Sequence, residues 1–276
     1  MKYLRKIYLV FLLAVFFGAE TADAQWARGK GDGYLQVSIG GAVADQQFNT
    51  ERELEILGRR DNPDEFSEIA TYLYFEYGLT PNLTLITSTF AKRMRVENNN
   101  TKLITTGLSD IVPQLRYSFS IGDKLVLSPQ FGVKIPTGYD KNESPPLGSG
   151  EVDYLMSTQA GYSLYPLPVY IGSSFGFKKR GGLQADEFFG HIEIGYRTDK
   201  QFLLRVRGSF IESATGTSNR FDINEQNNAQ AWVKAGPGIT LIINDHWQAN
   251  LDPSWTVDGR TTAQIFSLIG GIAYEW

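Results

Sequence analysis

Apolar and polar side chains alternate along most of this chain with a period of two, which is the period of a β-strand. In the segment near 109–119, Ile111 and Leu115 share one face, whereas Asp110 and Arg116 share the other. Equally clear alternation occurs near 125–135, 202–210 and 266–276. Such segments predict strands that have one apolar face and one polar face.

Short turns and longer polar stretches separate these segments in strict succession. Gly, Pro, Asn and Asp supply the backbone angles that tight turns require. They mark five short turns, at 78–82, 120–124, 165–168, 197–200 and 243–246. The longer polar stretches lie at about 44–65, 94–106, 137–150, 179–186, 211–229 and 257–261. Five turns and six loops delimit twelve strands.

The regular contrast between short turns and long loops is typical of outer-membrane barrels, whose periplasmic turns are short and whose outer loops are long. Because backbone polar groups in lipid must all be paired, a sheet that crosses a membrane has to close on itself. We therefore predict an all-β fold, a closed antiparallel up-and-down transmembrane β-barrel of about twelve strands. Segment 83–93 alternates too poorly for its two faces to be assigned.

Aromatic residues at the strand ends favour a membrane barrel over a soluble β-sandwich, which could also alternate. They lie beside the short turns and are Tyr77, Tyr117, Phe119, Trp247, Tyr274 and Trp276. Rings at this level form the girdle of a membrane interface. The aromatic end of the chain, Trp276, also has the form of the C-terminal signal that the barrel-assembly machinery reads. A periplasmic sandwich or jelly roll is the alternative fold.

The first 24 residues have the three parts of a secretory signal peptide. A start with three Lys and Arg residues precedes an apolar run at 7–18, and Ala-Asp-Ala follows at 22–24. The run of about twelve residues is shorter than the roughly twenty that a membrane-spanning helix needs. We expect residues 1–24 to be cleaved and residues 25–276 to form one outer-membrane barrel domain.

Composition narrows the classes of partner and of chemistry. The chain has no cysteine, so no disulfide framework supports it. Its net charge of −4 argues against a nucleic-acid partner, because phosphate binding needs clustered positive charge.

The two histidines do not suggest an active site or a metal centre. His246 lies in a short turn at the periplasmic end, the wrong end for an outer-membrane lipase. His191 and Glu193 share one strand face, but two ligands without a third make a weak metal site. We expect no enzymatic activity, no catalytic residue, no metal and no other cofactor.

Three segments in the middle of the chain resemble, in order, those of a known family. Residues 107–111 with 115–117 are similar to its "GLGD" strand opening, 135–138 to its "P-T-G" strand end, and 147–150 with 153–154 to its return strand. The family consists of outer-membrane transporters linked to the meta pathway of phenol degradation. The resemblance implies a closed barrel that takes up small aromatic or hydrophobic compounds, and it carries no catalytic residues. Ser109 stands where that family usually has glycine, and the substrate is not carried over.

The inner wall supplies the candidate pore-lining residues. By alternation, Tyr72, Tyr74, Tyr170 and Trp232 face the lumen. These rings are open to two interpretations: they form a path for aromatic solutes, or they fill a narrow barrel as large side chains commonly do.

Charged residues on the same inner face are expected to pair across strands. A turn that sets Phe119 opposite Leu125 would place Asp110 opposite Lys134, with Arg116 on the same face. A similar count places His191 and Glu193 beside Arg205 and Arg207, within one register step. Cross-strand neighbours lie about 4.5–5.5 Å apart at Cβ, which is near enough to pair.

The function that these features favour is a channel or transporter for small molecules, hydrophobic or aromatic ones included. The alternative is a structural or adhesion barrel whose lumen is plugged by its own side chains. The expected partners are outer-membrane lipid, lipopolysaccharide, the barrel-assembly machinery and a small-molecule solute, without nucleic acid.

Overall fold

The computed structural model describes residues 28–182, 184–198, 201–214 and 230–276. The expected signal peptide, most of the loop at 211–229 and the tip of the turn at 197–200 lie outside the described residues. The described residues contain no helix that is long and apolar enough to cross a membrane.

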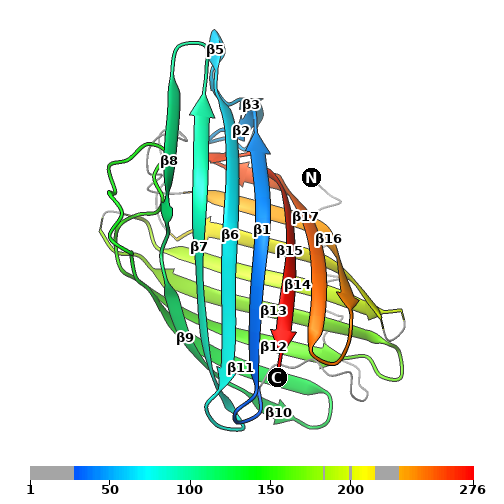
Figure 1. Cartoon of the computed structure of the whole chain (residues 1–276). Coiled ribbons are helices and arrows are strands. Elements are labelled where there is room, and N and C mark those ends of the chain that lie inside the picture. Colours follow the sequence, from blue (N-terminus) through cyan, green and yellow to red (C-terminus); the bar gives the residue numbers. More distant parts are fainter. Residues whose placement is uncertain (1–27, 183, 199–200, 215–229) are drawn as a thin grey trace.

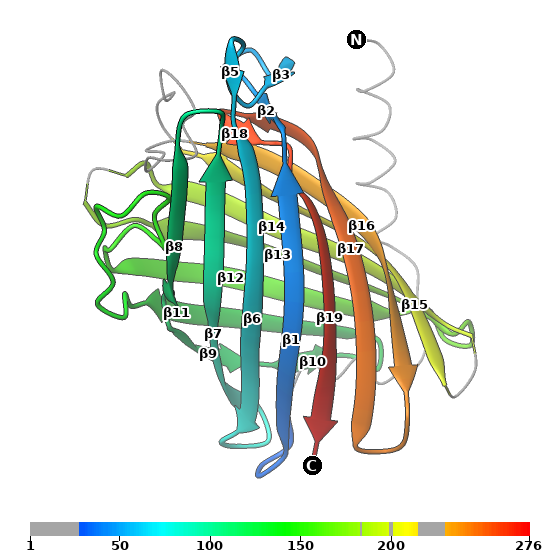
Figure 2. The same ribbon diagram turned by 45° about the horizontal axis from the view of Figure 1, so that its top comes forward.

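The wall is one antiparallel sheet that closes on itself (Figures 1 and 2). Its strands are β1 (Gly33–Ala44), β6 (Glu65–Gly78), β7 (Leu83–Glu97), β8 (Lys102–Leu108), β9 (Val112–Tyr117), β10 (Phe119–Ile121), β11 (Leu125–Lys134), β12 (Asp153–Ser163), β13 (Val169–Lys179), β14 (Glu187–Arg197), β15 (Phe202–Ser213), β16 (Ala231–Ile242), β17 (Trp247–Arg260) and β19 (Phe266–Glu275). β1 pairs with β19 and β6, and β9 pairs with both β7 and β11, which closes the ring. Because β8, β9 and β10 succeed one another as a single interrupted strand, the barrel has twelve strands, as predicted.

Two small sheets lie in the loops. β2 (Gln46–Phe48), β3 (Leu54–Ile56) and β18 (Thr262–Ala263) form one, and β4 (Gly58–Arg59) and β5 (Asn62–Pro63) form the other. They lie at the end of the barrel opposite the short turns and the C-terminus (Figure 1). We refer to these two ends as the loop end and the turn end.

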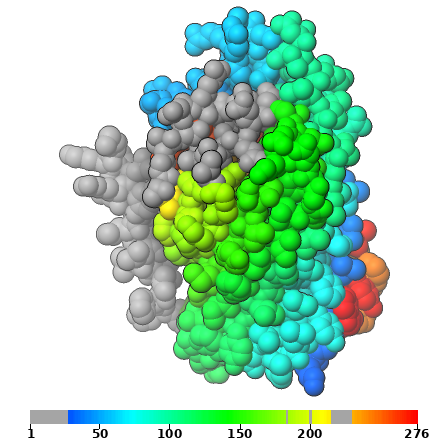
Figure 3. Space-filling model, turned by 90° about the vertical axis from the view of Figure 1, so that its left-hand side faces the viewer, coloured from blue at the N-terminus to red at the C-terminus, as the bar shows by residue number. Residues whose placement is uncertain are grey.

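The outer face of the wall is apolar, as lipid requires. Val206 and Ile39 are each 64% exposed and Ile69 is 67% exposed, whereas their polar neighbours point inward. In the space-filling view of the side that carries β7 to β12, the side chains form a continuous surface (Figure 3). Near the turn end, ring pairs such as Trp247–Tyr274, with centroids 4.8 Å apart, and Tyr117–Phe119, 6.4 Å apart, make up the expected aromatic girdle.

Two details of the expected layout are wrong. The polar stretch at 94–106 is mostly strand, because β7 and β8 continue to a short connection at 98–101. In addition, Phe119 lies opposite Leu127 rather than Leu125, and Ile121 pairs with Leu125. Gly122 adopts a φ of 63°, which lets three residues close the turn and shifts the register by two.

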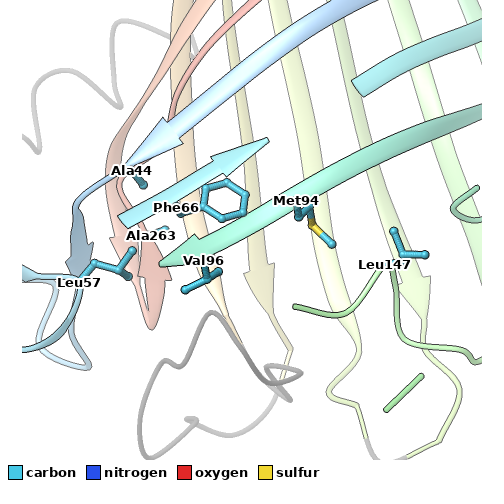
Figure 4. Close-up of a cluster of buried hydrophobic side chains, with 7 residues drawn as sticks. All are labelled: Ala44, Leu57, Phe66, Met94, Val96, Leu147 and Ala263. Atoms are coloured by element: carbon cyan, nitrogen blue, oxygen red, sulfur yellow. The ribbon is translucent and has the colours of Figure 1, made fainter. Parts of the chain in front are cut away.

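The inner face of β7 explains why segment 83–93 does not alternate. Ile86, Met94 and Val96 are at most 4% exposed and point inward together with Thr84, so apolar groups occur on both faces of this strand. At the loop end, Met94 and Val96 join a buried cluster with side chains from two loops (Figure 4). The cluster consists of Ala44, Leu57, Phe66, Met94, Val96, Leu147 and Ala263, and we call it the apolar seal.

Closure of the sheet leads to a first prediction. The full chain in mild detergent should migrate faster on a gel when unboiled than when boiled, because a closed ladder of backbone hydrogen bonds resists unfolding by detergent. Boiled protein is the internal control. Identical mobility of the two samples would contradict a closed barrel.

Candidate functional site in the barrel lumen

Two adjacent cavities occupy the lumen. The larger one, of about 930 Å³, reaches the turn end, where Asn244 and Asp245 line it. The smaller one, of about 370 Å³, lies deeper, and both are lined by Gln36 and His191. We call them the vestibule and the inner chamber. Together they form a polar space that extends inward from the turn end.

A buried ion network crosses the vestibule. Arg28, which precedes β1, lies 2.8 Å from Glu76 on β6 and 2.6 Å from Glu275 on β19. Arg116 on β9 lies 3.1 Å from Glu76 and is 4% exposed. Arg28 therefore connects the segment before the first strand to β6 and β19, and Glu76 extends the network to β9. Arg116 was a predicted site residue, whereas the pattern of the strands gave no signal for Arg28.

Tyrosines line the vestibule beside this network. Tyr74 donates a hydrogen bond to Glu76 at 2.5 Å, and Tyr34 donates one to Gln36 at 2.7 Å. Tyr170 on β13 donates a hydrogen bond to Glu193 on β14. The structure thus places Tyr74 and Tyr170 on the inner wall, with hydroxyl groups held by carboxylates and rings available to a solute.

Arginines from β15 meet two carboxylates at the boundary of the inner chamber. Arg205 and Arg207 each approach Asp252 on β17 to 2.8 Å, and Arg205 lies 3.7 Å from Glu193. Glu193 lies directly opposite Arg207 in the register of β14 and β15. Asp252 was not predicted, although polar residues at every second position of β17 mark its inner face.

Of the remaining predicted residues, two line the inner chamber and Trp232 lies beside it, against Lys234. Tyr72 and His191 both line the inner chamber. Lys234 on β16 lines it as well, and its amine lies 4.7 Å from the ring centroid of Trp232. Lys234 was not predicted, but its place two residues after the inward Trp232 could have identified it.

A second ion cluster lies toward the loop end. Lys134 on β11 is 3.4 Å from Asp110 and 2.9 Å from Asp153. Tyr139, in the β11–β12 loop, donates a 2.6 Å hydrogen bond to Asp110. Burial, together with this bond to a carboxylate, raises the pKa of the Tyr139 phenol above its ordinary value. The Asp110–Lys134 pair thus forms despite the shifted register.

Within the described residues, no group of three or more His, Asp or Glu side chains is arranged to hold a metal ion. His246 lies in the β16–β17 turn, where its ring contacts the backbone carbonyl of Glu275 at 2.8 Å. The lumen therefore offers binding chemistry: cations, carboxylates and phenols set around a water-accessible space.

The fold and this lumen define a transmembrane β-barrel of the outer-membrane type. The model of the family described as "Putative MetA-pathway of phenol degradation" matches residues 30–269, and the chain belongs to this family. No curated protein sequence matches the chain.

Solved structures share the fold at low sequence identity. An outer membrane channel from Pseudomonas putida F1 superposes with a TM-score of 0.72 at 12% identity, over 94% of this chain and 100% of that one. The translocator domain of the autotransporter NalP from Neisseria meningitidis has a TM-score of 0.54 at 12% identity, over 99% and 96%. The NanC porin has a TM-score of 0.53 at 8% identity, over 87% and 100%.

Proposed function

We propose that this chain is an outer-membrane channel that admits small molecules, aromatic compounds among them. The observation that carries the proposal is the pair of adjacent cavities, about 930 and 370 Å³, of which the larger reaches the turn end. A barrel that only braced a membrane would have no need of a polar space of this size. Membership of a family named for phenol degradation and the similarity in fold to an outer membrane channel support the same conclusion.

The predicted pore-lining residues take a specific part in this proposal. Tyr72, Tyr74, Tyr170 and Trp232 offer ring faces to a solute, and Arg116, Arg205 and Arg207 with Glu193 and His191 set its polar path. Asp110 and Lys134 hold the loop end together. In this proposal a signal peptide is cleaved after Ala24, the assembly machinery recognises the aromatic C-terminus, and lipid and lipopolysaccharide surround the wall.

The apolar seal supports a second candidate, a barrel that does not transport. Leu57 is 0% exposed and Leu147 is 3% exposed, so two loops contribute fully buried side chains at the loop end. The two candidates differ in a single observable, which is passage through the lumen.

Passage can be measured with the full mature chain refolded into liposomes and into planar bilayers. A channel should give discrete conductance steps and admit benzyl alcohol and other small test solutes faster than protein-free membranes do. The matched control is the same chain with Tyr74 and Tyr170 replaced by phenylalanine, which keeps the rings and removes the two hydroxyl groups. Membranes that stay as tight as protein-free ones would overturn the channel and favour the plugged barrel.

A further inference from the structure

The inner chamber carries more positive than negative charge. Its immediate surroundings contain three cations, Arg205, Arg207 and Lys234, and two carboxylates, Glu193 and Asp252. Both arginines pair with Asp252, whose other oxygen accepts a 2.6 Å hydrogen bond from Asn250. The two carboxylates are thus committed to the arginines. A third carboxylate nearby, Glu68, is offset by Lys92 at 3.8 Å, so one positive charge is left over.

That excess charge resides on Lys234. Within the described part of the chain, no carboxylate lies within 4.0 Å of its amine, which lies 4.7 Å from the centroid of the Trp232 ring. The acid that acts on it from farther away is Glu68, which lies 3.8 Å from Lys92. The side chain is half-buried and lines the chamber. A cation that is partly removed from water and has only a distant acid, itself near a second cation, is costly to hold, so an anion that enters the chamber relieves the cost.

Other groups around the chamber can take the remaining bonds of an anion. Arg207 also lines it, and the Nε of Arg207 has no hydrogen-bond partner within the described residues. His191 offers a ring nitrogen from the neighbouring strand. Hydrogen bonds between charged donors and a carboxylate are shorter and about twice as strong as neutral ones. The cationic side of the chamber therefore suits a carboxylate.

The rest of the chamber is suited to a flat apolar group. Tyr72 and Ile269 line it, and the Tyr72 ring packs against Phe90 with centroids 5.7 Å apart. The volume of about 370 Å³ falls at the lower end of the roughly 300–1,000 Å³ that small-ligand pockets occupy. A single ring fits this space.

We propose that the inner chamber is a binding site for a small aromatic carboxylate, with Lys234 and Arg207 holding the carboxylate and Tyr72 packing against the ring. This rests on the proposed function, since it names the class of solute that the channel would select. A neutral phenol would leave the excess charge of Lys234 uncompensated, and a carboxylate without a ring would leave the Tyr72 side of the chamber empty.

The test measures binding of three probes to the refolded mature chain in detergent micelles at neutral pH, by isothermal titration. The probes are benzoate, benzyl alcohol, which keeps the ring without the charge, and acetate, which keeps the charge without the ring. Benzoate is expected to bind at least about tenfold more tightly than either control, because it alone makes the charge-assisted bonds and the ring contact together.

Substitutions identify the site. Lys234→Met should weaken benzoate binding about tenfold while leaving benzyl alcohol unaffected, and Lys234→Gln serves as a second variant if the first folds poorly. Lys124→Met, which makes the same charge change in the β10–β11 turn, should leave benzoate binding unchanged. Gel mobility of unboiled samples establishes that each variant is a folded barrel.

The outcomes separate this inference from the channel. Equal affinity for benzoate and benzyl alcohol, no benzoate binding, or an unchanged affinity in both Lys234 variants would overturn the carboxylate site. If such a protein still passes solutes through bilayers, the proposed channel stands without it. Benzoate binding that depends on Lys234 in a barrel that passes nothing would keep the site and reject the channel.

Discussion

Replacing Glu187 with alanine is expected to lower the free energy of unfolding of the barrel by about 3–5 kcal/mol. Glu187 is 1% exposed and accepts bonds from two cations, Lys178 at 2.7 Å and Arg180 at 2.8 Å. Its removal leaves both cations in a buried setting without this carboxylate. Urea titration of the protein in lipid vesicles, followed by tryptophan fluorescence, measures the difference.

An exposed ion pair at the same end of the barrel provides the control for this prediction. Asp61 lies 3.0 Å from Arg59, and both side chains are more than 70% exposed. Replacing Asp61 with alanine should change the free energy of unfolding by about 0–1 kcal/mol, because water and salt already screen the pair. If Glu187→Ala had an effect as small as this control, water would reach Lys178 and Arg180 and the buried description would be wrong.

The wall of the barrel could be predicted from the sequence because strands and tight turns depend on residues that are neighbours in the chain. A strand that separates lipid from lumen must alternate, and a tight turn must contain residues that tolerate its backbone angles. Hence the strand count and the five turns follow from residue types alone. The faces of β9, β11 and β15 also follow, as the exposure of Leu115, Phe131 and Val206 demonstrates.

The register between β10 and β11 could not be predicted because it depends on how their turn closes. The expected Phe119–Leu125 pair assumed a five-residue turn, whereas Gly122 at positive φ allows a connection of three residues. A shift of two residues keeps every side chain on its face. For that reason the predicted Asp110–Lys134 ion pair forms although the predicted register was wrong. A shift of one residue would have placed the two side chains on opposite faces of the sheet.

The candidate site was predicted in part. Alternation places four of its residues on the inner face: His191, Glu193, Arg205 and Arg207. The same pattern could have identified Lys234. Arg28 differs, because it acts from a segment that belongs to no strand. Contacts made by loops and by segments outside the strands carry no periodic signal, so sequence pattern alone cannot show what they touch.

The same limitation applies to the apolar seal, whose two loop residues looked like ordinary loop positions. Leu147 lies in the β11–β12 loop, which polar contacts hold in place: Ser109 donates a 2.9 Å hydrogen bond to the backbone carbonyl of Leu147, and Lys134 donates one of 2.6 Å to Ser149. The Leu147 side chain lies at one end of the apolar seal, and Leu57 lies at the other (Figure 4). The loop thus brings an apolar group to the loop end of the lumen, opposite the vestibule.

Replacing Leu147 with aspartate is therefore expected to raise single-channel conductance severalfold. An ionised carboxylate in the apolar seal would lose its hydration without gaining a partner, which costs several kcal/mol, so the loop residue should leave the seal. The barrel itself should still form, because the hydrogen bonds of the wall do not pass through this side chain. Planar-bilayer recordings measure the change, with Glu143→Ala, an exposed substitution in the same loop, as the matched control.

Leu147→Ala should give a smaller rise, since it removes volume at a cost of about 2–5 kcal/mol without introducing charge. Conductance that is the same in Leu147→Asp as in Glu143→Ala would mean that the seal does not limit passage, and that the resistance of the pore lies at the arginines of β15 instead.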